Sequence, residues 1–154
     1  MSNLKEVNDT VYKIIGSCME VHKTLGPGYP VDFYKKSLET EFKQRELTFE
    51  TDKALPVIFK ESTVGQFIID FFVNDGVPVM LRAQEELKDI EIQQVLRAMG
   101  LAGKTLGLLV NFGNIKIQYK RVLPSRQSKD LRKDPYRMMP YRETGRTRED
   151  NPVI

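Results

Sequence analysis

The chain has 154 residues, 40% of them hydrophobic and 29% charged, a composition typical of one globular domain. No apolar run approaches the roughly 20 residues of a membrane-spanning helix, and the N-terminal residues lack the apolar stretch of a signal peptide. The single Cys18 cannot form an internal disulfide. These features argue against membrane and secreted classes, and we expect a cytoplasmic protein with a buried free thiol.

The net charge of +3 belongs to the C-terminal part of the chain. Residues 1–123 contain 16 Lys+Arg and 16 Asp+Glu, whereas residues 124–154 contain 8 Lys+Arg and 5 Asp+Glu. Proteins that hold duplex DNA by its phosphates normally present a basic surface on the folded domain. The neutral body therefore argues against a duplex-DNA binder.

Two helices are predicted at the start of the chain. Apolar residues recur at helical spacing from about Asn8 to Leu25, with Asn8 or Asp9 as the N-cap. The segment 26–30, Gly-Pro-Gly-Tyr-Pro, ends this helix because its prolines and glycines disfavour continuation. A second helix is predicted over residues 31–45.

Three strands are predicted next, over residues 55–59, 64–73 and 77–83. Asn74-Asp75-Gly76 contains the Asp-Gly pair typical of a tight hairpin between the last two. Gly65, near the start of the long strand, is expected to mark a β-bulge.

The second half ends with a helix and two strands. The helix is predicted over residues 88–99, with Gly100 as its C-cap. A near-continuous apolar run at 105–112 predicts a strand buried on both faces, and alternation over 115–122 predicts an edge strand. We therefore predict an α/β fold, a mixed sheet flanked by helices, in a domain of residues 1–123.

Residues 124–154 contain four prolines and no sustained apolar period, so we expect an extended C-terminal arm rather than part of the core. Its side chains of the types enriched in interface hot spots are Arg132, Tyr136, Arg137, Met138, Met139, Tyr141 and Arg142. They favour an arm that binds a protein partner or a second copy of the chain in a homo-oligomer. A solubilising extension and contact with nucleic acid are the alternatives.

Several short motifs occur in a fixed order between residues 14 and 122. They are Glu20-Val21-His22 followed by Leu25-Gly26-Pro27-Gly28, the spacing Gly28-x-x-Val31-x-x-Tyr34, Asp70, Ala83-x-Glu85-Glu86-Leu87, and Leu108-Leu109-Val110-Asn111-Phe112-Gly113. In this order they resemble the GxxExxY family, a branch of the PD-(D/E)XK nuclease superfamily. The resemblance implies a restriction-endonuclease-like αβββαβ core and, in intact members, a metal-dependent nuclease centre. The arm has no counterpart in it.

The centre implied by the resemblance consists of an Asp and a Glu that hold Mg²⁺, a Lys two residues after that Glu, and a Glu from the preceding helix. The corresponding residues here are Asp70, Met80, Arg82 and Val31. A thioether is a soft ligand for a hard cation, and a guanidinium stays protonated. The resemblance therefore implies a catalytically degenerate member with no metal cofactor, which we expect to act as a binding or assembly module through its edge strands and arm.

Two other interpretations of these residues stay open. A centre rebuilt on Asp70 and Glu91, with Asp32 and Arg82 nearby, would give a Mg²⁺- or Mn²⁺-dependent nuclease, and a non-cleaving nucleic-acid binder is the third possibility. If the centre is a relic, we expect Asp70 and Arg82 to form an ion pair, because a lone charge is costly to bury. His22, the only histidine, is expected to be a hydrogen-bonded structural residue rather than a catalytic base.

Overall fold

The structure is a computed structural model that describes residues 4–124. A five-stranded mixed sheet, in the order β1-β2-β3-β4-β5, lies at its centre. The elements are α1 (Leu4–Leu25), α2 (Val31–Gln44), β1 (Phe49–Phe59), β2 (Ser62–Val73), β3 (Val77–Arg82), α3 (Asp89–Ala102), β4 (Gly107–Asn111) and β5 (Gln118–Val122). Strands β3 and β4 are parallel and joined through α3, whereas the other neighbours are antiparallel. The predicted α/β fold and element order are confirmed.

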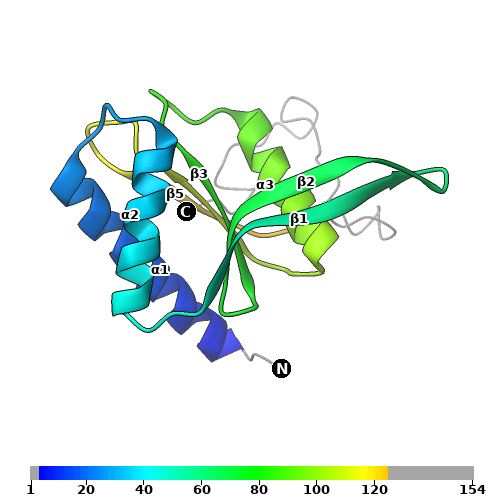
Figure 1. Cartoon of the computed structure of the whole chain (residues 1–154), viewed down its shortest axis with the longest axis horizontal. Helices are drawn as coiled ribbons and strands as arrows, with labels where there is room; N and C mark the ends of the chain where they lie inside the picture. Colours follow the sequence, from blue (N-terminus) through cyan, green and yellow to red (C-terminus); the bar gives the residue numbers. More distant parts are fainter. Residues whose placement is uncertain (1–3, 125–154) are drawn as a thin grey trace.

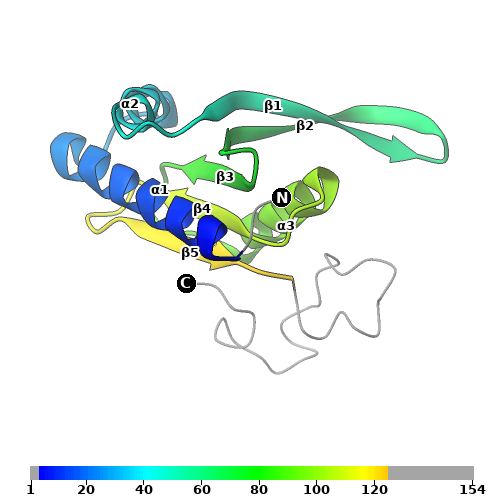
Figure 2. The same ribbon diagram turned by 90° about the horizontal axis from the view of Figure 1, so that it is seen from below.

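Helices cover both faces of the sheet, with α1 and α2 on one face and α3 on the other (Figures 1 and 2). The alternation of side chains along β3 supplies both cores. Val79 and Leu81 pack in the core beneath α1 and α2, whereas Met80 packs against α3. The same alternation holds in β4, which is buried along its whole length as its apolar run predicts.

Strands β1 and β2 form a long hairpin that extends beyond the rest of the molecule (Figures 1 and 2). Its two-residue turn, Lys60 and Glu61, has positive φ at both positions, as a primed hairpin turn requires. The register shifts by one residue where Val57 pairs with Gly65, which confirms the predicted bulge. The large hydrophobic residues of the hairpin that are exposed are Ile58, Phe59, Val64 and Ile68.

Several predicted boundaries are wrong. Helix α1 already includes Leu4, so neither Asn8 nor Asp9 is its N-cap. Gly100 lies inside α3, and the left-handed cap is Gly103, with φ of 68°. Strand β1 begins at residue 49 rather than 55, because its pairing with β2 continues to the start of the β2–β3 turn.

The arm of residues 125–154, with the interface residues named in it, lies outside the described part of the chain. Within residues 4–124, no helix combines the length and the apolar character needed to cross a membrane. At the two edges of the described sheet lie β1 and β5, so the edge position predicted for the last strand is confirmed.

Candidate functional site

Asp70 lies at the point where β2 separates from β3. Backbone pairing of these strands begins at Phe71 with Val79, one residue beyond Asp70. The Asp70 carboxylate replaces the missing backbone acceptor, since its Oδ2 accepts a hydrogen bond from the Leu81 N–H at 2.8 Å. The other oxygen, Oδ1, lies 3.6 Å from the ammonium of Lys35 on α2. Both oxygens of Asp70 therefore have partners.

Lys35 was not predicted as part of the site. Its ammonium also forms an ion pair with Asp52 of β1. Burial lowers the pKa of Lys35, but the hydrogen bond to Asp52 and the charges of Asp70 and Asp52 outweigh burial and raise that pKa above its ordinary value. The ammonium therefore stays protonated and supplies a positive charge beside Asp70.

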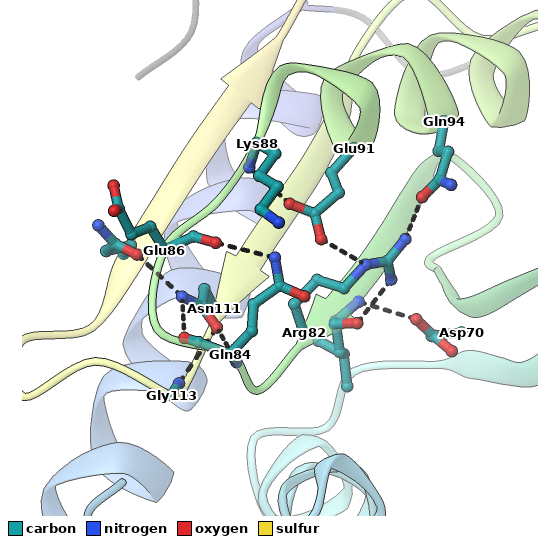
Figure 3. Close-up of polar contacts among 11 residues, drawn as sticks. Asp70, Arg82, Gln84, Glu86, Lys88, Glu91, Gln94, Asn111 and Gly113 are labelled. Atoms are coloured by element: carbon teal, nitrogen blue, oxygen red, sulfur yellow. Dashed lines mark hydrogen bonds and ion pairs between the residues drawn. The ribbon is translucent and has the colours of Figure 1, made fainter.

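Arg82, at the end of β3, extends toward α3 (Figure 3). Its Nε donates to Glu91 Oε2 at 3.2 Å, its Nη1 donates to the Leu81 carbonyl at 2.7 Å, and its Nη2 donates to Gln94 Oε1. Each guanidinium nitrogen therefore has an acceptor, and two of the three acceptors belong to the first two turns of α3.

Glu91 makes a second hydrogen bond besides its contact with Arg82. Its Oε1 accepts the N–H of Lys88 at 2.6 Å, the carboxylate half of a capping box at the start of α3. The residue is only 6% exposed. A buried carboxylate with both oxygens engaged in this way is a structural group that joins β3 to α3.

The prediction of an ion pair between Asp70 and Arg82 is wrong. Within the described residues, Asp70 pairs with Lys35 and Arg82 pairs with Glu91. The reason is geometric, because Arg82 lies on the α3 side of β3 whereas Lys35 approaches Asp70 from α2, on the other face of the sheet.

The other residues named for the site do not join Asp70 in a metal-binding group. Asp32 is exposed in the first turn of α2, Met80 is buried in the α3 core, and Val31 packs against the core of α1 and α2. In the part of the chain that the structure describes, no three His, Cys, Asp or Glu side chains gather where they could hold a metal ion. His22 bonds through Nε2 to the Asn114 carbonyl at 2.9 Å, as expected of a structural histidine.

Tyr34, the last residue of the Gly28-x-x-Val31-x-x-Tyr34 spacing, is structural. Its hydroxyl donates to the Gly26 carbonyl at 2.6 Å and accepts the N–H of Tyr29 at 3.2 Å. Its ring stacks on Phe112, with centroids 4.6 Å apart. The motif therefore fixes the glycine-rich turn between α1 and α2 against the end of β4.

Asn111, at the end of β4, holds the segment that leads from β3 to α3. Its Oδ1 accepts from Gln84 N at 2.9 Å and from Gly113 N at 3.1 Å, while its Nδ2 donates to Gln84 O at 2.8 Å and to Gln118 Oε1 at 2.9 Å (Figure 3). Asn111 is fully buried. A lone amide at the end of an apolar run was the signal in the sequence, whereas nothing local marks Lys35, whose partners come from β1 and β2.

The donors present do not fit a Mg²⁺ centre of the kind that the motifs imply. Mg²⁺ prefers oxygen ligands in near-octahedral geometry. Of the two carboxylates proposed for a rebuilt centre, Asp70 is held by a backbone N–H and an ammonium, and Glu91 by Arg82 and a backbone N–H. Met80 offers only a thioether, and Val31 offers no donor.

Comparison with known proteins agrees with the fold. Residues 8–122 match the family model described as the PD-(D/E)XK nuclease superfamily. The match spans all five strands, α2, α3 and most of α1. Neither the search of curated proteins nor the search of solved structures found a match.

Proposed function

Because the chain belongs to the PD-(D/E)XK nuclease superfamily, we propose that it is a member of the GxxExxY branch whose catalytic centre has become structural. In this proposal the protein acts as a binding or assembly module through its edge strands and C-terminal arm. The observation that carries it is the pairing of Arg82 with Glu91 at 3.2 Å, at the position that the resemblance assigns to a catalytic lysine.

The chemistry of the superfamily requires a cation beside the scissile phosphate and a group that positions or activates the attacking water. A lysine can lose its proton at accessible pH, whereas a guanidinium cannot. Arg82 is moreover engaged by Leu81, Glu91 and Gln94. The residue that would act on the water therefore stabilises the β3–α3 junction instead.

The rebuilt nuclease is less well supported by the same contacts. It requires Asp70 and Glu91 to hold one cation together. Glu91 would have to leave Arg82 and the N–H of Lys88, and Asp70 would have to leave Lys35. Each of these steps exposes an unpaired charge or donor in a partly buried site, which costs free energy.

The β1–β2 hairpin supports the proposed binding role. It extends beyond the body (Figure 1), and Ile58, Phe59 and Val64 near its tip are 57%, 62% and 62% exposed. Clustered exposed apolar side chains on a projecting element mark interaction surfaces. Strand β1 is also an edge of the described sheet, which leaves backbone groups available for pairing.

The proposal is tested with the full chain in two assays. Light scattering across a concentration series measures self-association of the wild type, of Ile58→Ser/Phe59→Ser, and of a Tyr136→Ala/Tyr141→Ala arm variant. Cleavage of single- and double-stranded DNA and RNA with Mg²⁺ or Mn²⁺ is measured in parallel. We expect no cleavage, and weaker association in at least one of the two variants.

The opposite results separate the alternatives. Metal-dependent cleavage that is lost in Asp70→Ala would overturn the proposal in favour of a rebuilt nuclease. Binding of nucleic acid without cleavage, with an affinity that falls steeply as salt rises, would instead favour the non-cleaving binder. Association unchanged in both variants would remove the hairpin and the arm as contacts between copies.

A further inference from the structure

Arg121 on β5 carries a cationic side chain without a partner in the described structure. Its Nε is buried and makes no hydrogen bond. No hydrogen bond or ion pair of its guanidinium is formed within residues 4–124. Arg121 pairs across the sheet with Leu108, whose side chain packs in the core on the α1 face. A buried donor without an acceptor is destabilising, so this arrangement indicates a missing acceptor.

The guanidinium lines a groove of about 390 Å³ at the end of β5. Leu4, Val7 and Asn8 of α1 form one wall of this groove. Thr105, Leu106 and Leu123 form most of the remainder, and Arg121 supplies its one charge. A mostly apolar groove with a single cation suits a segment that offers a carboxylate next to an apolar side chain.

The chain itself leads out of this groove. Leu123 lines it, and the polypeptide continues through Pro124 into residues 125–154. The first carboxylate after β5 is Asp130, and the next residue, Leu131, is the first apolar side chain after Pro124. Residues 125–129 provide five residues for the return, within the usual length of a loop. A tether this short also gives a high effective concentration at the groove.

We propose that Asp130 and Leu131 dock into the groove between α1 and β5, with the Asp130 carboxylate accepting from Arg121 and the Leu131 side chain covering the apolar wall. The root of the arm would then lie against the domain, and its Tyr- and Met-containing part from Tyr136 onward would be presented from a fixed place. The docking contact does not depend on the proposed function. Only the binding role of that outer part rests on it.

Solution NMR on the full chain tests this contact directly. The exchange of the Arg121 Nε–H with water is measured in the wild type, in Asp130→Asn and in the matched control Asp134→Asn, with Arg121→Lys to assign the resonance. We expect slow exchange in the wild type and in the control. In Asp130→Asn we expect exchange faster by about tenfold, as for loss of a charge-assisted hydrogen bond.

A second variant, Leu131→Ser, should shift the amide resonances of Val7, Asn8 and Leu106 while the rest of the spectrum stays unchanged. Equal exchange of the Arg121 Nε–H in the wild type and Asp130→Asn would overturn the proposal, as would a larger effect of Asp134→Asn. Protection that rises with protein concentration would assign the carboxylate to a second copy and overturn docking within one chain. None of these results depends on nuclease activity or on association through the hairpin, so failure of this inference and failure of the proposed function are distinguishable.

Discussion

The Nε of Arg82 donates a hydrogen bond to Glu91 Oε2 at 3.2 Å, which ties the end of β3 to the first turn of α3. The side chains of the two residues are 22% and 8% exposed. A pair buried to this extent is costly to break from one side, because the remaining charge stays in a poorly solvated site. The resemblance places a catalytic lysine at the position of Arg82, so in the proposed function this contact stands where a catalytic group would be.

Replacing Arg82 with Met should therefore destabilise the protein, although a methionine fills a similar volume. Glu91 keeps the N–H of Lys88 but loses its counter-charge, and we expect a loss of about 3 kcal/mol in the free energy of unfolding. Urea unfolding followed by circular dichroism measures it.

The control for that variant is the double substitution Arg82→Met/Glu91→Gln. The glutamine side chain in the double variant is uncharged and can still accept the Lys88 N–H, so much of the lost stability should return. If the single and double variants were equally destabilised, the ion pair would not be the cause, and packing around Arg82 would have to explain the loss.

Tyr34→Phe removes only the hydroxyl of Tyr34, the last residue of the Gly28-x-x-Val31-x-x-Tyr34 spacing. The phenyl ring keeps its stacking on Phe112, but the carbonyl of Gly26 and the N–H of Tyr29 lose their partner. We expect destabilisation of about 1–2 kcal/mol, measured by thermal unfolding. An unchanged melting temperature would show that the hydroxyl is not structural and would reopen a functional role for it.

Gly113→Ala tests how closely the loop after β4 approaches the segment after β3. A Cβ at position 113 would lie 2.3 Å from both the N and the O of Gln84, which are backbone atoms held by Asn111. We expect a loss of about 3 kcal/mol or more, because neither backbone can move without breaking those bonds. Gly65→Ala is the matched control, since a Cβ there meets open space.

Cys18 should be unreactive in the folded protein. It is 1% exposed on α1, and burial raises the pKa of its thiol, with only a smaller opposing effect from the charge of Arg45. A disulfide reagent such as DTNB should therefore react only after unfolding. Reaction at the rate of a free thiol in the folded protein would contradict this burial.

The raised pKa of the Cys18 thiol should make the stability of the protein depend on pH. Its pKa is raised in the folded protein, whereas in the unfolded chain it ionises near pH 8.5, as in model peptides. The unfolded state therefore binds fewer protons above that pH, and stability falls by up to about 1.4 kcal/mol per pH unit. In the difference between the wild type and Cys18→Ala, this loss should be absent below pH 8 and should grow above it.

The fold could largely be predicted from the sequence because hydrophobic period and turn residues act locally. The buried run that forms β4 and the glycine-rich stop after α1 both appear where predicted. The predicted boundaries were wrong where pairing with a distant element determines where a strand begins. Residues 49–54 belong to β1 because β2 pairs with them, and no local pattern in these residues predicts that pairing.

The contacts of the candidate site also depend on elements that are distant in the sequence. The sequence predicted a possible group of Asp70, Glu91, Asp32 and Arg82. In the structure Arg82 contacts Glu91, Asp70 contacts the N–H of Leu81 and Lys35, and Asp32 is exposed. Which charge pairs with which depends on the side of the sheet from which each helix approaches. Lys35 reaches Asp70 from α2, and Glu91 reaches Arg82 from α3, so the simplest pairing of neighbours on adjacent strands was not the one formed.

The most direct test of the central claim is a calorimetric titration of the full chain with Mn²⁺ and Mg²⁺, with Asp70→Ala beside the wild type. If Asp70 is engaged by Lys35 and the Leu81 N–H as described, neither protein should bind a cation stoichiometrically, and the two titrations should coincide. Stoichiometric binding by the wild type that disappears in Asp70→Ala would contradict the account and restore the nuclease centre.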